Sequence, residues 1–85
     1  MILVTGGTGL LGSHLLFELC NKGIAVRATK RSTSNLDNVK KVFSYYTSDI
    51  DTLLKKIEWV EVDFLDVYSL INCLEGVEQV YHCAA

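Results

Sequence analysis

The residues best suited to chemistry in this sequence form a glycine-rich segment near its start, Thr5-Gly6-Gly7-Thr8-Gly9-Leu10-Leu11-Gly12. The segment lies between an apolar run and a helical pattern, which is the context in which such glycines bind a dinucleotide. We expect Gly6 to allow a tight turn, Gly9 the close approach of a diphosphate, and Gly12 the packing of the helix near the sheet. The free N–H groups at the helix start, including those of Leu10 and Leu11, then bind phosphate oxygens with the help of the helix dipole.

Two other interpretations of these glycines are available. The first is a phosphate-binding loop of the ATPase type, but Gly12 is followed by Ser13 and His14, so the lysine that must reach the β and γ phosphates is absent. The second is a tight turn with no ligand. Several glycines at this spacing destabilise a chain unless something requires the space, which favours the dinucleotide site.

Cationic residues cluster where the second strand is predicted to end. NAD-binding proteins of this type place an acid there, about 20 residues after the glycines, whereas this chain has Lys30 followed by Arg31. Arg31 offers a planar fork of donors to a 2′-phosphate, and Lys30 offers a point charge. The sequence therefore predicts NADP rather than NAD, with a solvated basic face as the alternative. Five of the eight cations fall in this region: Arg27, Lys30, Arg31, Lys40 and Lys41.

The elements that must position these residues alternate between strand and helix. Apolar and β-branched runs predict strands over residues 2–4, 25–29, 57–62 and 77–83. Helical periodicity predicts helices over 10–22, ending at Gly23, and over 67–74, ending at Gly76, with two weaker helical segments over 39–46 and 50–56. The predicted fold is α/β, the N-terminal half of a doubly wound Rossmann sheet with four parallel strands in the order 3-2-1-4, forming one domain over residues 1–85.

Four ordered motifs resemble the extended short-chain dehydrogenase/reductase family, in its dihydroflavonol-reductase-like branch. They are the T-G-x-x-G-x-x-G segment, the second strand at residues 26–31, Asp63-Phe64-Leu65-Asp66, and the fourth strand at residues 80–85, which ends in His82-Cys83-Ala84-Ala85. The resemblance implies that Asp63 binds the adenine amino group and that Phe64 meets the adenine through its backbone. It also implies that Cys83, Ala84 and Ala85 line the cofactor near its ribose. A turn or helix-start carboxylate is the alternative for Asp63.

The same resemblance sets the expected function of the whole protein. The chain would bind the ADP-ribose and diphosphate of NADP(H) for an oxidoreductase or epimerase/dehydratase that acts on a carbonyl or secondary alcohol. The family's catalytic Tyr-x-x-x-Lys and its Ser or Thr partner would follow Ala85, so this chain alone is expected to be catalytically silent, and His14 and His82 are expected to be structural. The alternatives are a non-enzymatic NADP-binding redox sensor and an epimerase that retains NAD, which Lys30 disfavours.

Composition narrows the setting of the 85-residue chain. Its net charge of −2 disfavours nucleic acid and anionic membranes as ligands. Three cysteines without C-x-x-C spacing predict reduced thiols and no metal site, and no apolar run is long enough for a membrane span or resembles a leader, so we expect a cytoplasmic protein. A complete sheet would place a further strand beside the fourth, so we expect self-association through that exposed edge.

Overall fold

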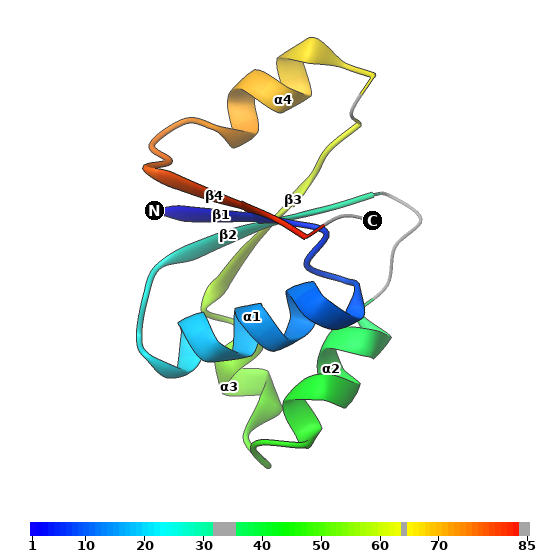
Figure 1. The fold of residues 1–85 in the computed structure, drawn as a ribbon, viewed down its shortest axis with the longest axis vertical. Helices are drawn as coiled ribbons and strands as arrows, with labels where there is room; N and C mark the ends of the chain where they lie inside the picture. Colours follow the sequence, from blue (N-terminus) through cyan, green and yellow to red (C-terminus); the bar gives the residue numbers. More distant parts are fainter. Residues whose placement is uncertain (32–35, 64, 84–85) are drawn as a thin grey trace.

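The computed structural model describes residues 1–31, 36–63 and 65–83, which form one sheet with helices on both of its faces (Figure 1). Strands and helices alternate as the sequence predicts, and the two weaker helical segments expected between the second and third strands are both helices. In chain order the elements are β1 (Ile2–Thr5), α1 (Leu10–Asn21), β2 (Val26–Lys30), α2 (Asp37–Ser44), α3 (Ile50–Leu54), β3 (Ile57–Glu61), α4 (Val67–Cys73) and β4 (Gln79–His82).

The sheet is parallel throughout and has the order β3-β2-β1-β4, which confirms the predicted topology. Val4 of β1 stands between Ala28 of β2 and Tyr81 of β4, so all three strands end at the same edge of the sheet. The strand order reverses direction between β1 and β4. In open α/β sheets, ligands bind outside the carboxyl ends of the strands at such a reversal.

Two apolar clusters hold the helices to the sheet. The larger lies between the sheet and the layer formed by α1, α2 and α3, and it contains Val4, Leu16, Val26, Ala28 and Phe43. The smaller lies under α4, on the opposite face (Figure 1), where its buried members are Leu3, Val62 and Cys73. Few buried side chains therefore fix α4, while the three-helix face carries most of the core.

Local sequence explains where the helices begin and end. Gly23 has a φ of +74°, and its N–H donates to the Cys20 carbonyl while the Ile24 N–H donates to the Leu19 carbonyl. This is a Schellman motif, and it confirms that Gly23 terminates α1. Helix α2 begins at Asp37, two residues before the predicted start at residue 39, because an acidic side chain in the first turn favours a helix N-terminus.

Strand β4 is a bare edge. All four of its residues are exposed, including Val80 at 50% and Tyr81 at 42%. It is also shorter than the predicted 77–83 span, because Val77 closes the turn after α4 through a bond from its N–H to the Leu74 carbonyl. The exposed apolar surface continues on α4, where Val67 and Ile71 are 63% and 60% exposed.

The three cysteines are free thiols, with Cys20 and Cys73 buried and Cys83 half-buried. Burial raises the pKa of the Cys20 thiol to about 11, and the nearby positive charge of Lys56 only partly offsets this rise. Cys20 is therefore a protonated packing residue rather than a nucleophile. Over the described ranges, no helix combines the length and the apolar character that crossing a membrane requires.

Candidate functional site

The glycine-rich segment forms a tight turn between β1 and α1. Gly6 has a φ of +71°, a backbone conformation that side chains rarely adopt, and its carbonyl accepts a bond of 3.1 Å from the Gly9 N–H. The predicted conformational role of Gly6 is therefore confirmed. The turn brings the chain from the carboxyl end of β1 directly to the first residue of α1.

Gly12 is required by the turn rather than by the sheet. A Cβ atom on Gly12 would overlap the Gly6 carbonyl oxygen and would lie 2.8 Å from the Gly7 Cα. Close packing of helix and sheet occurs instead at Gly7, where a Cβ would lie 2.8 Å from Leu16 Cδ1 and 3.4 Å from the Cβ of Ala28 in β2. We expected Gly12 to allow α1 to approach the sheet. The structure shows instead that Gly12 allows α1 to approach the backbone of the glycine turn, at Gly6 and Gly7.

Ser13 fixes the turn from inside, and sequence reasoning missed it. The side chain is fully buried, and its hydroxyl lies 2.6 Å from the Gly9 carbonyl and 3.1 Å from the Gly7 carbonyl. A serine in the first turn of a helix commonly bonds to the carbonyl four residues earlier, and this was the signal available in the sequence. Ser13 thus ties the first turn of α1 to the glycine turn that precedes it.

The mouth of α1 is open. Within the described residues, Gly9 is the N-cap and supplies no side-chain cap, and Leu10 and Leu11 are each 70% exposed. The first N–H groups of a helix lack partners within it and carry the positive end of its dipole. The arrangement can therefore bind an anion such as a phosphate through backbone amides.

The two cations predicted to meet a 2′-phosphate lie at the carboxyl end of β2. Lys30 is the last residue of the strand and is half-buried, and Arg31 follows it and is exposed. Lys30 is two residues beyond Ala28, the residue paired with Val4 of β1, so both cations lie at the same sheet edge as the glycine turn. Their placement is compatible with one ligand that spans β1 and β2.

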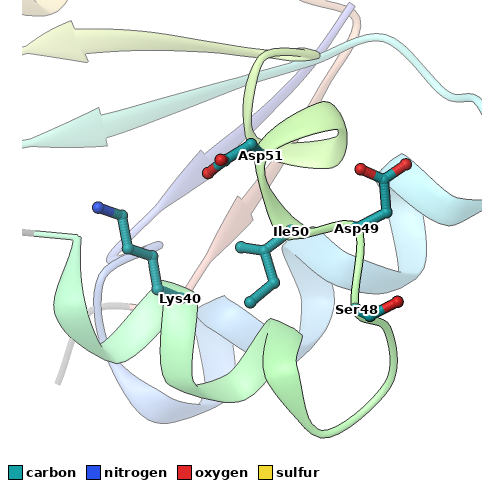
Figure 2. A pocket seen from close by; sticks show the side chains of 5 residues that line it. All are labelled: Lys40, Ser48, Asp49, Ile50 and Asp51. Carbon is teal, nitrogen blue, oxygen red and sulfur yellow. The ribbon is translucent and has the colours of Figure 1, made fainter.

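The remaining cations of the predicted cluster lie elsewhere. Arg27 points to the α4 face, where its guanidinium donates to the carbonyls of Cys73 (2.9 Å) and Glu75 (2.6 Å). Lys40 borders a surface pocket between α2 and α3, together with Ser48, Ile50 and two carboxylates (Figure 2). The five cations therefore do not form one face, and the acids beside Lys40 make that pocket unsuitable for a phosphate.

Asp63 follows β3 and fixes a turn. Its Oδ1 accepts a bond of 2.9 Å from the Leu65 N–H, and its carbonyl accepts from the Asp66 N–H. Asp66 then caps α4 by accepting from the Tyr68 N–H at 3.0 Å. The structure thus shows the alternative role for Asp63, a turn carboxylate, although this role uses only one of its two oxygens. Phe64 lies outside the described residues.

The end of β4 lies beside the glycine turn. The Cys83 N–H donates to the Thr5 carbonyl at 2.9 Å, so Cys83 continues the ladder past the last residue of the strand. Ala84 and Ala85 lie outside the described residues. His14 Nδ1 lies 2.7 Å from the Tyr46 hydroxyl on the outer surface of α1, which agrees with a structural role. Among the residues that the structure places, no group of three or more His, Cys, Asp or Glu could hold a metal ion.

Three known proteins illustrate what the chain is similar to. It is 31% identical to the bifunctional dihydroflavonol 4-reductase/flavanone 4-reductase of Pyrus communis, over 98% of this chain and 22% of that protein. Among solved structures, AtPrR2 with NADP+ and (+)-pinoresinol has a TM-score of 0.72 at 25% identity, over 99% of this chain and 25% of that one. MoeE5 in complex with UDP-glucose and NAD has a TM-score of 0.68 at 30% identity, over 99% and 22%.

These relatives are much longer than the chain, which spans about a fifth of the curated relatives that it matches. They include reductases, and the structures similar in fold include epimerases. The model of the NAD-dependent epimerase/dehydratase family, which binds nicotinamide dinucleotides, matches residues 2–85. With its parallel Rossmann sheet and its glycine turn at the mouth of α1, the chain belongs to the NAD-dependent epimerase/dehydratase family.

Proposed function

We propose that the chain binds the ADP-ribose and diphosphate part of NADP(H) at the carboxyl edge of its sheet. The observation that carries this proposal is the uncapped start of α1, which a turn built on Gly6 and Gly12 leaves open to a ligand. Membership of a family that binds nicotinamide dinucleotides supports the same ligand. In a protein of the length of its relatives, the bound dinucleotide would exchange hydride with a carbonyl or secondary alcohol.

Different residues of the site would contact different parts of the dinucleotide. The amides of Leu10, Leu11 and Gly12 would bind the diphosphate beside Gly9, whose own N–H donates to the Gly6 carbonyl. Lys30 with Arg31 would bind the 2′-phosphate. Asp63 would bind the adenine amino group through the carboxylate oxygen that its turn does not use, and Phe64 would meet the adenine through its backbone. Cys83, Ala84 and Ala85 would line the nearby ribose.

The choice of NADP over NAD rests on the end of β2. One structure of similar fold holds NADP+ and another holds NAD, so family membership leaves both cofactors available. Lys30 occupies the place where NAD-binding proteins put an acid, and Arg31 beside it is exposed and within reach of solvent anions. A 2′-phosphate would gain two charge-assisted contacts there, whereas a 2′-hydroxyl would gain none of comparable strength.

Replacing both cations by acids, Lys30→Glu with Arg31→Glu, should weaken NADPH binding by roughly tenfold to thirtyfold. This range corresponds to two exposed contacts of about 1 kcal/mol each. NADH binding should change by less than about threefold, because NADH lacks the 2′-phosphate. Isothermal titration calorimetry with both dinucleotides measures the ratio directly.

The matched control for that experiment is Lys55→Glu with Lys56→Glu, which changes the net charge by the same amount. Both lysines are exposed and lie between α3 and β3, at the amino end of the sheet. This control should leave the NADPH/NADH ratio unchanged. Equal losses for the two dinucleotides in the Lys30/Arg31 variant would contradict the assignment of NADP.

The free cysteines bear on the cellular compartment of the protein. Cys20 and Cys73 are buried and free, and a protein with three unpaired cysteines suits a reducing environment. We therefore propose a cytoplasmic location for the protein.

We also propose that the 85-residue chain self-associates through β4. Among the described residues, the outer edge of β4 has no strand partner, and all four residues of β4 are exposed. Gln79, Val80 and Tyr81 carry no charge to oppose pairing. The opposite edge, β3, carries Glu58 and Glu61 and is less suited to pairing. A second copy pairing along β4 would extend the sheet and cover Val80.

Light scattering on a concentration series should show dimers that disappear in Val80→Lys. Val67→Lys is the matched control, because it places the same charge on an exposed valine of α4 away from the strand edge. A monomer at high concentration in the unmodified chain would contradict this proposal. Equal dissociation in both variants would place the contact on α4 rather than on β4.

A further inference from the structure

A side-chain hydrogen bond joins the carboxyl ends of β1 and β4. Thr5, the last residue of β1, is the register partner of His82, the last residue of β4, and its Oγ1 lies 2.5 Å from His82 Nδ1. The backbone adds a second link one residue later, from the Cys83 N–H to the Thr5 carbonyl at 2.9 Å. These two hydrogen bonds hold the ends of β1 and β4 together at the edge where both strands leave the sheet.

This pair lies where a dinucleotide site depends most on geometry. The sheet order reverses between β1 and β4, and Thr5 leads directly into Gly6, whose φ of +71° begins the glycine turn. Cys83 follows His82 on the other side of the same reversal. A small rotation of β4 relative to β1 would therefore change the distance between the mouth of α1 and Cys83.

Strand β4 has little else to hold its end in place. Its four residues are exposed, and its described strand neighbour is β1 alone. The side-chain bond from Thr5 is thus an addition to a single parallel ladder. Thr5 is 7% exposed whereas His82 is exposed, so the bond between them is partly buried, on the Thr5 side.

We propose that His82 is a positioning residue for the dinucleotide site. The Thr5 hydroxyl donates to Nδ1, because a buried hydroxyl proton requires an acceptor and a neutral imidazole offers one ring nitrogen for this purpose. His82 is thereby held in the tautomer that carries its proton on Nε2. The bond fixes the position of Cys83 relative to the glycine turn. The residues that would contact the diphosphate and the ribose are then at the right separation before the ligand binds. This inference rests on the proposed dinucleotide site.

Four single variants and one double variant test the bond. Thr5→Val and His82→Ala each remove one partner and should weaken NADPH binding by about tenfold, while Thr5→Val/His82→Ala should be no weaker than either single variant. Thr5→Ser keeps the hydroxyl, and His82→Asn keeps an acceptor near the place of Nδ1, so both should bind within about twofold of the unmodified chain. Energy transfer from Trp59, the one tryptophan in the sequence, to NADPH follows the titration.

Two further measurements separate positioning from general destabilisation. Ile57→Val is the control for destabilisation, because it removes one buried methyl group at the amino end of β3. It should lower the free energy of unfolding by an amount comparable to the loss in Thr5→Val or His82→Ala and should leave NADPH binding unchanged. Nitrogen-15 NMR of the His82 ring should show Nδ1 unprotonated in the unmodified chain and a mixture of tautomers in Thr5→Val.

The outcomes distinguish this inference from the proposed function. If the unmodified chain binds NADPH and both Thr5→Val and His82→Ala bind it equally well, the positioning role is overturned. Additive losses in the double variant would also overturn it, because the residues would then act separately. If the unmodified chain binds neither NADPH nor NADH, the proposed function fails. In that case the nitrogen-15 NMR of the His82 ring still tests the hydrogen bond between Thr5 and His82. A proton on Nδ1 would exclude a donation from the Thr5 hydroxyl.

Discussion

Gly12→Ala should strongly weaken dinucleotide binding and lower the free energy of unfolding by about 3 kcal/mol. The added Cβ would overlap the Gly6 carbonyl oxygen and press on the Gly7 Cα, and both are backbone atoms that cannot rotate away. The turn can accept a methyl group there only by opening, which moves the amides of Leu10 and Leu11 away from the place of the diphosphate. We expect NADPH affinity to fall by at least about 100-fold, which corresponds to about 2.7 kcal/mol.

Gly9→Ala is the matched control for stability only, because it adds the same methyl group to the same turn but at a residue that the proposed diphosphate site uses. Its Cβ would lie 3.4 Å from the Gly6 carbonyl oxygen, which the turn can accommodate. Alanine is a poorer N-cap than glycine, so we expect a loss of about 1 kcal/mol in unfolding free energy. Urea denaturation followed by Trp59 fluorescence gives the stability of each variant, and titration with NADPH gives its affinity. Binding of NADPH by Gly12→Ala at the level of the unmodified chain would contradict the role of the turn.

Backbone requirements were readable from the sequence. The glycines at positions 6, 9 and 12 lie between a strand and a helix, and only a tight turn satisfies that context, so the turn at Gly6 was predicted. The structure shows that Gly6 makes this turn with a positive φ. The strand order followed in the same way, because parallel strands joined by right-handed crossovers leave few topologies. Rules that act through the main chain need no knowledge of distant side chains.

Side-chain partners far apart in the sequence were not readable in this way. Arg27 was grouped with Lys30 and Arg31 because all three are close in sequence, yet its guanidinium bonds to Cys73, 46 residues away. The period of two in a strand already separates them, since Lys30 shares a face with the buried Val26 and Ala28 and Arg27 does not. Proximity in sequence thus overstated the basic cluster, and strand alternation corrects it.

Arg27→Met should lower the free energy of unfolding by about 3 kcal/mol through loss of the anchor of α4. The Arg27 side chain is 14% exposed, and it donates to two carbonyls at the C-terminal end of α4, where a cation also meets the helix dipole favourably. Its Nε adds an ion pair with Glu58 Oε2 at 3.2 Å that lacks the alignment of a hydrogen bond. Methionine keeps the apolar stem and removes the donors, and Arg27→Lys should recover only part of the loss because it lacks the planar fork.

Hydrogen exchange should locate the effect of Arg27→Met, because the bulk of the core lies on the other face of the sheet. Amides of α4 should exchange faster by a larger factor than those of α1, since few buried side chains fix α4. Arg31→Met removes the same charge from an exposed side chain and should change the unfolding free energy by less than about 0.5 kcal/mol. The effects of the two variants on cofactor preference should be the reverse of their effects on stability. Arg31→Met should lower the preference for NADPH over NADH, whereas Arg27→Met should leave that preference unchanged in the folded fraction. If Arg27→Met lowered the NADPH/NADH ratio as much as Arg31→Met, Arg27 would belong with the cations at the end of β2 rather than with α4.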